Sequence, residues 1–342
     1  MNAAAILAIP ETEPERLFKV PDQLVSEYRA LVKRWHPDAG GDTAVFAHIG
    51  ALYRQAEQKI HKGIWQPPGL LEITDRFGKR YRLQYRSRRP FELGEMFIGL
   101  SVVTYVMPRS HEALVLNALK QIGHIRYPDQ TFRKSLEPCM PKVLRAFETA
   151  TDWVVCIQKR PDEVLLADLI KHLGGQIEPK HTAWIISSLL NLACFLDVAG
   201  VTLNSMSVST VFASPTKHTV SLYGGWWYAA EAGKLLTHLP PDTLPLASAA
   251  LRTYKVATGE LDLQSIKAIG RACLGDPSGG SLRGRKDLPS PFSQFLQLPA
   301  AKSAFVEYER WPKVLEDSFG PRRYHELKIT GEDVYPQGAQ NG

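Results

Sequence analysis

The tripeptide His36-Pro37-Asp38 carries side chains suited to recognising another protein. The Asp38 carboxylate can pair with a cation on a partner, and Pro37 restricts the backbone, so that the turn keeps a fixed shape. Three cations precede the tripeptide: Arg29, Lys33 and Arg34. Positive side chains gathered in this way steer association toward an acidic surface, and salt weakens that steering. These residue types alone fit either a contact with an acidic partner or a solvated basic face beside a turn of no special function.

Two segments with helical periodicity flank the tripeptide and must position it. In the first, apolar residues recur at the spacing of one helix face: Leu24, Tyr28, Leu31 and Trp35. This helix must end before Pro37, which has no backbone donor and disfavours helical geometry at His36. The second stripe comprises Phe46, Ile49, Tyr53, Ala56 and Ile60. Two amphipathic helices joined by a short turn are expected to pack as an antiparallel hairpin.

The stretch YRALVKRWHPDAGGD resembles the core of the DnaJ-like J domain, and the resemblance extends over residues 17–60. It implies a co-chaperone that docks on a DnaK-type chaperone and stimulates its ATP hydrolysis. The docking residues that it implies are Tyr28, Arg29, Lys33, Arg34, His36, Pro37 and Asp38. The first helix of that family would have to fit into PERLFKVP, so we expect it to be short.

A basic run follows the hairpin. Tyr81, Leu83 and Tyr85 alternate with polar and basic residues, and this period of two predicts a half-buried strand whose basic side faces solvent. The same run leaves a nucleic-acid surface open as an alternative, with Arg86, Arg88 and Arg89 as its contacts. Further strands are expected over residues 97–106 and 153–158, and helices over residues 112–122, 165–173 and 182–198.

This order of elements resembles a protein-kinase-like fold, in which a strand-rich lobe with one helix precedes a helical lobe. The phrase LLNLACFLDVAGVTLNSMSVSTVFASPTKHTVSLYGGWWYA resembles the helix, the catalytic loop and the metal-binding loop of that family. The aromatic residues Trp226, Trp227 and Tyr228 at its end are expected to pack in the core rather than bind a ligand.

Carried over residue by residue, the resemblance places uncharged residues where the family has its chemistry. The catalytic aspartate position falls on Ser205, and the metal-binding asparagine position falls on Thr210. The metal-binding aspartate of the second loop falls near Gly224. The phosphate-pairing lysine falls near Tyr105, and its glutamate partner falls near Val115.

Phosphoryl transfer depends on carboxylates that hold magnesium and on a base at the acceptor hydroxyl. With these positions neutral, the sequence predicts a pseudokinase, not an enzyme, that needs no cofactor. An atypical kinase-like enzyme that binds nucleotide through other residues stays open as an alternative.

The composition is ordinary for a soluble protein, with 44% hydrophobic and 22% charged residues and a net charge of +6. No apolar run is long enough to span a bilayer, and MNAAAILAIP lacks the basic start of a secretory signal. The four cysteines are scattered without a CxxC pair, which suits reduced thiols better than disulfides or zinc. We therefore expect a cytoplasmic protein with no metal site and no membrane partner.

The expected organisation is multidomain. Residues 1–62 are assigned to a small all-α J-domain helical hairpin, and residues 63–75 to a linker that contains Pro67 and Pro68. An α+β, two-lobed protein-kinase-like domain follows, with its N-lobe over 76–160 and its helical C-lobe over 161–330; residues 331–342 are expected to be a flexible tail. The whole chain is then a co-chaperone or adaptor whose body binds an unknown client protein.

Overall fold

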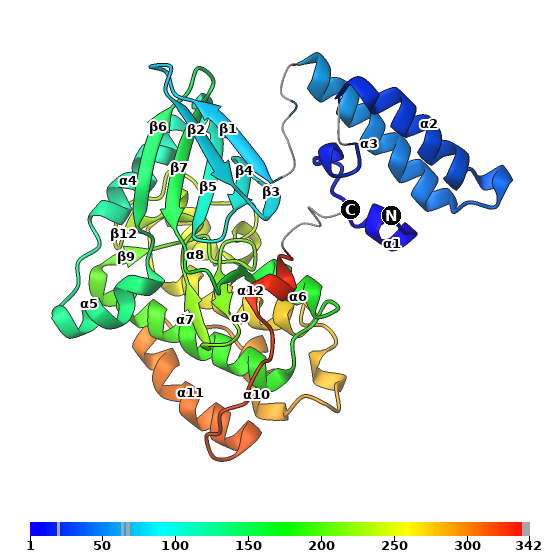
Figure 1. Cartoon of the computed structure of the whole chain (residues 1–342). Helices are drawn as coiled ribbons and strands as arrows, with labels where there is room; N and C mark the ends of the chain where they lie inside the picture. The colour runs from blue at the N-terminus through cyan, green and yellow to red at the C-terminus, as the bar shows by residue number, and fades with distance from the viewer. Residues whose placement is uncertain (19–20, 63–64, 66–68, 337–342) are drawn as a thin grey trace. The chain divides into compact units, whose positions relative to one another are not determined.

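The computed structural model of the chain describes residues 1–18, 21–62, 65 and 69–336. The chain divides into two compact units, Met1–Arg88 and Arg89–Gly342 (Figure 1). We call them the N-terminal unit and the body. The division differs from the expected one, in which the linker lay over residues 63–75.

Helices make up the first part of the N-terminal unit: α1 (Ala3–Leu7), η1 (Pro14–Arg16), η2 (Pro21–Gln23), α2 (Leu24–Trp35), η3 (Pro37–Ala39) and α3 (Thr43–His61). The two apolar stripes thus form α2 and α3, as expected, and these helices pack against each other. Leu24 of α2 and Ile49 and Leu52 of α3 are buried in their shared core. The Asp42 side chain caps α3 by accepting hydrogen bonds from the N–H groups of Ala44 and Val45.

The segment PERLFKVP contains a single 3₁₀ turn, Pro14–Arg16, in place of a helix. Residues 19 and 20 of this segment lie outside the described residues. The sequence did not predict α1, which packs against α3 and buries Ile6 completely. A helix of five residues has too few turns to show a clear periodicity, which explains why the pattern missed it.

A two-stranded hairpin completes the N-terminal unit. Strand β1 (Leu70–Thr74) lies in the region expected to be linker and pairs antiparallel with β2 (Arg80–Gln84). The alternation predicted for the basic run is present: Arg80 and Arg82 are exposed, and Tyr81 and Leu83 are half-buried.

The body begins with a five-stranded sheet of order β3-β4-β5-β7-β6. Its strands are β3 (Ser87–Phe91), β4 (Gly94–Ile98), β5 (Val102–Pro108), β6 (Val143–Glu148) and β7 (Asp152–Gln158). The single strand expected over residues 97–106 is wrong, because β4 and β5 form an antiparallel hairpin around Gly99, in which Phe97 pairs with Thr104. Both strands are apolar, so the hydrophobic pattern runs through the turn without a break.

Between the strands lie η4 (Arg109–His111), α4 (Glu112–Gly123), α5 (Gln130–Leu136) and η5 (Glu137–Cys139). Helix α4 and strand β7 confirm the helix expected over 112–122 and the strand expected over 153–158. The sequence did not predict α5, whose seven residues include four polar ones and only two apolar ones, Phe132 and Leu136.

The rest of the body is mainly helical. Its short strands and turns are β8 (Val164–Leu165), β9 (Val201–Thr202), β10 (Phe212–Ser214), β11 (Thr219–Ser221), η6 (Trp226–Tyr228), β12 (Ala230–Glu231), η7 (Leu244–Leu246) and η8 (Leu282–Gly284). Its helices are α6 (Leu166–His172), α7 (Pro179–Ala199), α8 (Ala249–Tyr254), α9 (Glu260–Cys273), α10 (Ser290–Gln297), α11 (Ala304–Phe319) and α12 (Gly331–Val334). Helices α6 and α7 confirm those expected over 165–173 and 182–198.

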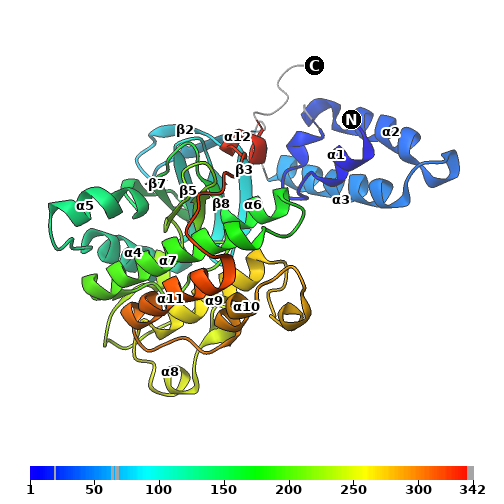
Figure 2. The same ribbon diagram turned by 90° about the horizontal axis from the view of Figure 1, so that it is seen from below.

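Helix α7 is the central helix of this part. It packs against α9 and α11, as both ribbon views show (Figures 1 and 2). By length and composition α7 could cross a membrane, but most of it is buried inside the body, with Ile185, Ile186 and Leu189 fully enclosed. Burial of this kind is what the core helix of a folded domain requires.

The C-terminal segment packs onto the body as far as the structure describes it. Residues 331–334 form α12, which contacts α6, and Tyr335 is only 6% exposed. A flexible tail was expected from residue 331 onward, whereas residues 331–335 are fixed by these contacts. Residues 337–342 of the expected tail lie outside the described residues.

Candidate functional site

The backbone of the loop between α2 and α3 is held by its own hydrogen bonds. The carbonyl oxygen of His36 accepts the N–H groups of Ala39 (3.0 Å) and Gly41 (2.9 Å), and that of Pro37 accepts the N–H of Gly40 (2.9 Å). Gly40 has a φ of +82°, which favours glycine. A Cβ atom on Gly41 would lie 2.2 Å from the carbonyl carbon of Trp35. The residue types of the loop therefore specify one compact turn.

The side chains of the tripeptide are arranged around this turn. His36 Nδ1 accepts the N–H of Asp38 (3.2 Å), which places the proton of the neutral imidazole on Nε2. The ring also meets Phe46 of α3 edge-on, with 5.1 Å between the ring centroids. The Asp38 side chain is 91% exposed. His36 thus fixes the loop, and the Asp38 carboxylate, with one oxygen 3.6 Å from His36 Nδ1, still faces solvent, where a partner can reach it.

The exposed face of α2 carries the predicted cations. Arg29, Lys33 and Arg34 are exposed, and among the described residues no acidic side chain pairs with them. Tyr28 lies on the other face, where its ring stacks on Tyr53 of α3 at 4.0 Å between centroids. The charged docking residues therefore lie on the exposed side of the hairpin, whereas Tyr28 is half-buried between the helices.

In the body, three of the positions carried over from the kinase resemblance come together after β9. Ser205 Oγ donates to the carbonyl oxygen of Gly225 (2.7 Å), and Thr210 Oγ1 donates to the carbonyl oxygen of Ser205 (2.8 Å). Gly224 donates its N–H to the carbonyl oxygen of Thr210 (3.2 Å). A Cβ on Gly224 would lie 2.9 Å from that oxygen, so the two loops approach too closely for a larger residue. The hydroxyl groups at these positions bind backbone atoms of the body.

Tyr105 joins this group from β5, whereas Val115 does not. The Tyr105 hydroxyl donates to the carbonyl oxygen of Tyr223 (3.3 Å), and burial raises its pKa, so the phenol stays neutral. Its ring meets Trp227 and Phe91 edge-on, at 5.2 Å and 5.5 Å between centroids. Val115 is a fully buried apolar residue of α4. Aromatic rings thus fill the space where β3, β5 and η6 meet.

The aromatic cluster at η6 is core, as predicted. Trp226, Trp227 and Tyr228 are each less than a tenth exposed. Trp226 Nε1 donates to the carbonyl oxygen of Leu222 (2.8 Å), which satisfies its only polar group. Asn117 of α4 donates to the carbonyl oxygens of Trp227 and Ala229 and fixes the turn against the helix.

A buried carboxylate that the sequence prediction missed supports the loop after β9. Asp262 of α9 accepts the N–H groups of Leu203 (2.8 Å) and Asn204 (2.7 Å). Burial raises the pKa of Asp262 to about 6, although both amide bonds act to lower it. The signal was present in the sequence, because Asp262 lies on the same face of α9 as the buried residues Ile266 and Ile269. An acidic residue within an apolar stripe indicates a buried hydrogen-bonded group.

A second carboxylate that the prediction missed links three segments of the body. Asp168 of α6 accepts from Arg89 of β3 and from the hydroxyl of Tyr335 (2.7 Å), and that hydroxyl accepts the N–H of Leu165 (3.0 Å). Loss of hydration raises the pKa of Asp168, and Arg89 opposes this rise. Arg89 was expected to lie on a solvent-facing basic surface. It instead pairs with the buried Asp168, although its own side chain is still 36% exposed.

Two hollows lie among the described residues of the body. One, of about 170 Å³, lies between α4 and residues 227–238 and includes Lys120 and Lys234 in its lining. The other, of about 360 Å³, lies between the end of α4 and η5 and includes Tyr127 and Arg133. Neither is lined by Ser205, Thr210 or Gly224. Among the described residues, no group of three or more His, Cys, Asp or Glu side chains is placed to hold a metal ion.

Comparison with known proteins bears on the fold through solved structures. No family model matches the chain, and no curated protein matches it. Among solved structures, the chain is similar to vaccinia related kinase 3, with a TM-score of 0.52 and 12% sequence identity. The match covers 76% of this chain and 94% of that chain.

This match contradicts the prediction that the chain is not an enzyme. The structure that shares its fold is that of a protein named a kinase, so neutral residues at five carried-over positions are no basis for denying the chain an activity. The prediction failed because it rested only on the absence of the expected residues at five positions taken from a resemblance. At 12% identity the likeness assigns no reaction. It shows that an N-terminal helical region precedes a mixed α+β body with a protein-kinase-like fold.

Proposed function

We propose that this chain is a J-domain co-chaperone, in which α2, α3 and the loop between them dock on a DnaK-type chaperone and stimulate its ATP hydrolysis. The observation that carries the proposal is the arrangement of the tripeptide. An exposed carboxylate, Asp38, stands on a turn that the backbone bonds of His36 fix, at the end of a helix with an exposed basic face.

The physical basis is a rigid charged surface. A partner that binds a preformed loop loses little conformational entropy, because the turn is already ordered by its backbone bonds. The cations Arg29, Lys33 and Arg34 would attract an acidic surface before contact, and Asp38 would pair with a cation once the two proteins meet. Association should therefore slow as salt increases.

The body would hold the second protein of the complex, a client or another partner. It has its own hydrophobic core and a protein-kinase-like fold. At the start of α11, Phe305, Val306 and Tyr308 are each at least 40% exposed, and apolar side chains gathered in this way suit contact with a protein. Phe305 and Tyr308, three positions apart, are neighbours on one face of α11 and would offer a client an apolar contact.

The test is the ATPase rate of a purified bacterial DnaK-type chaperone, measured in a single turnover with and without the full chain. We expect wild type to raise the rate and His36→Gln to leave it at its basal value, because glutamine cannot reproduce both the ring contact with Phe46 and the bond from Asp38. The matched control is His61→Gln, an exposed histidine at the end of α3, which should behave as wild type. Absence of stimulation by a folded wild-type chain would sink the proposal.

A second candidate function, a kinase-like enzyme that uses other residues, is favoured by one observation in the body. Glu92, which follows β3, and Asp242 are both exposed, and the charge of Asp242 acts to raise the pKa of Glu92. Two exposed carboxylates whose charges interact could bind magnesium or act as an acid–base pair. The check is a thermal-shift titration with ATP and magnesium. Wild type should be stabilised and Glu92→Gln should not, whereas a flat wild-type response would remove this candidate.

A further inference from the structure

The tip of the β1–β2 hairpin is built as a rigid five-residue turn. Asp75 donates its N–H to the carbonyl oxygen of Lys79 (2.9 Å), and Gly78 donates to the carbonyl oxygen of Asp75 (3.0 Å). Gly78 has a φ of +85°, the left-handed conformation that closes a hairpin of this type. The Asp75 carboxylate accepts the N–H groups of Phe77 and Lys79, both at 2.9 Å. The turn therefore has a defined shape that presents its side chains outward.

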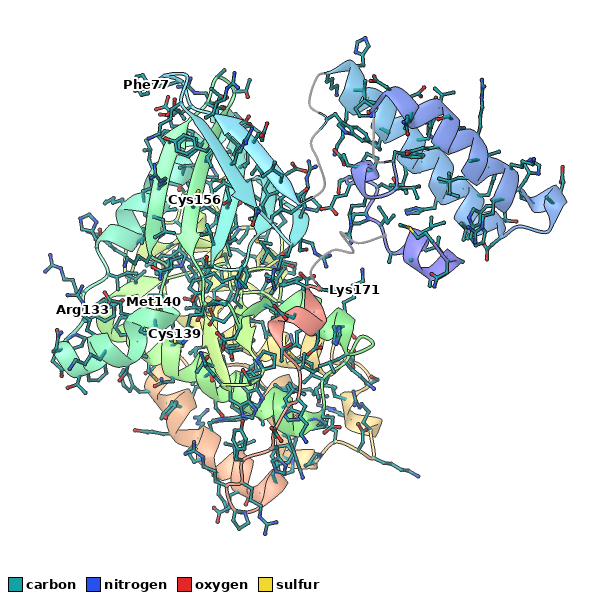
Figure 3. The ribbon with its side chains drawn as sticks, viewed as in Figure 1. Phe77, Arg133, Cys139, Met140, Cys156 and Lys171 are labelled. Carbon is teal, nitrogen blue, oxygen red and sulfur yellow. The ribbon has the colours of Figure 1, made fainter. Side chains whose placement is uncertain are left out.

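The side chain at this tip is aromatic and almost wholly in solvent. Phe77 is 81% exposed and points away from the hairpin (Figure 3). The guanidinium of Arg76 lies 4.8 Å from the centre of its ring. One face of the Phe77 ring is therefore open for stacking. The exposed ring contributes little to the packing of the hairpin.

The charge around Phe77 is positive. Residues 76–89 include seven cations and no acidic residue, and the carboxylate of the turn itself, Asp75, accepts the N–H groups of Phe77 and Lys79 and interacts with the charge of Lys79. Part of this charge is used inside the protein: Arg82 pairs with Glu72 (2.7 Å), Arg88 donates to the carbonyl oxygen of Thr12 (3.2 Å), and Arg89 pairs with Asp168. Two of the cations nearest the tip, Lys79 and Arg80, are exposed and form no ion pair with a described residue. The available charge thus lies at the tip, next to the exposed ring.

We propose that the hairpin tip is a contact site for single-stranded nucleic acid, in which a base stacks on Phe77 and the neighbouring phosphates pair with Lys79 and Arg80. Stacking of a base on an aromatic side chain, combined with cations that follow the backbone, is how proteins bind single strands without reading a sequence. A membrane surface fits less well, because one phenylalanine buries too little apolar area to anchor a protein of this size. The site is independent of the proposed docking on a chaperone.

The test uses fluorescence anisotropy with labelled single-stranded oligonucleotides, oligo(dT) and oligo(U), and with a DNA duplex of the same length. We expect wild type to bind both single strands more tightly than the duplex, in which paired bases cannot stack on the ring. Phe77→Ala should raise the Kd for single strands about fivefold or more. The matched control is Phe132→Ala, a phenylalanine of α5 that is 45% exposed, and it should leave Kd unchanged.

The charge component is tested through salt. Neutralising both cations, Lys79→Gln with Arg80→Gln, should reduce the slope of log K against log salt by about 1.4, since each phosphate contact on a single strand contributes about 0.7. The control changes Arg322 and Arg323, two exposed arginines near the C-terminus, to Gln. It has the same net charge and should keep the wild-type slope. Melting temperatures equal to that of wild type would show that every variant is folded.

Three results would overturn the proposal. One is no measurable binding of either single strand by wild type at low salt. Another is an equal loss of affinity in the Phe77 and Phe132 variants, or equal binding of the duplex, which would indicate attraction by net charge alone. The third is binding to vesicles that contain phosphatidylserine, lost in Phe77→Ala, without binding to the oligonucleotides. That outcome would assign the tip to membranes instead.

Discussion

The loop after α2 and the loop after β9 both hold polar side chains in a fixed turn, but their side chains face different surroundings. In the first, the Asp38 side chain is 91% exposed, and the backbone of the loop binds itself. In the second, Asn204 and Ser205 are buried, and they bond to backbone atoms of other segments of the body.

This difference separates two uses of a polar loop. Where backbone bonds and the His36 ring hold the turn, the Asp38 side chain is left exposed to a partner. Where the side chains supply the missing hydrogen bonds, as at Ser205 and Thr210, they are committed to holding segments together. Loss of the carboxylate at the first loop should therefore weaken partner binding and leave stability unchanged. Loss of the carboxylate that supports the second loop should lower the stability of the body.

The largest loss of stability is expected for Asp262→Ala. The change leaves the buried N–H groups of Leu203 and Asn204 without an acceptor, and each such group costs about 1–3 kcal/mol. The free energy of unfolding of the body should fall by about 2–6 kcal/mol. Urea unfolding followed by tryptophan fluorescence measures this, since most of the seven tryptophans lie in the body. A loss below about 0.5 kcal/mol, the usual size of a surface substitution, would contradict the role assigned to Asp262.

The Asp262 carboxylate should also make the free energy of unfolding of the body depend on pH. Its pKa is raised from 3.8 to about 6, so between these values the folded state binds more protons than the unfolded state. The stabilising contribution is complete below pH 3.8 and is lost as pH rises through 6, by on the order of 3 kcal/mol. Wild type should therefore lose stability relative to Asp262→Asn between pH 4 and pH 7. Parallel stability profiles for the two proteins would argue against a buried ionisable group.

The apolar patterns predicted α2, α3, α4 and α7, because each presents a long stripe with a helical period. They failed where the pattern carries no break, as in the β4–β5 hairpin around Gly99. The apolar patterns also failed where the role of a residue depends on a partner that lies far away in the sequence. Arg89 resembled its exposed neighbours until the fold brought it to Asp168, and Asp262 acquired its role from the backbone of residues 203 and 204.

The candidate sites were predictable to different degrees for the same reason. The tripeptide and its basic neighbours are contiguous, so the sequence alone grouped them. The loop after β9 depends on contacts between residues that are dozens of positions apart, and local spacing cannot report those contacts. The enzyme prediction failed at this point, because it compared positions one at a time.

A smaller effect is expected when the shape of the first loop is changed. Gly41→Ala would place a Cβ 2.2 Å from the carbonyl carbon of Trp35, so the backbone must shift, at a cost of about 1–3 kcal/mol. Amide hydrogen exchange in α2 and α3 should become faster. Stimulation of a DnaK-type ATPase should fall as well, since the turn no longer places Asp38. The control is Gly50→Ala in α3, where the nearest atom lies 3.7 Å away and the helix should gain stability. Unchanged exchange in Gly41→Ala would show that the loop is not tightly specified.

The smallest effect on stability, and the sharpest contrast with Asp262, is expected for Asp38→Asn. The side chain is 91% exposed, so the free energy of unfolding should change by less than about 0.5 kcal/mol. Asparagine also keeps the size of the side chain and the backbone N–H that His36 accepts. Chaperone stimulation should nevertheless be lost, because the charge is the part of the residue that a partner can reach. If Asp38→Asn stimulates as well as wild type while Arg29→Gln does not, the basic face of α2 alone makes the contact. If both stimulate fully, the loop is a structural turn, and the two loops do not differ in the way that their exposure suggests.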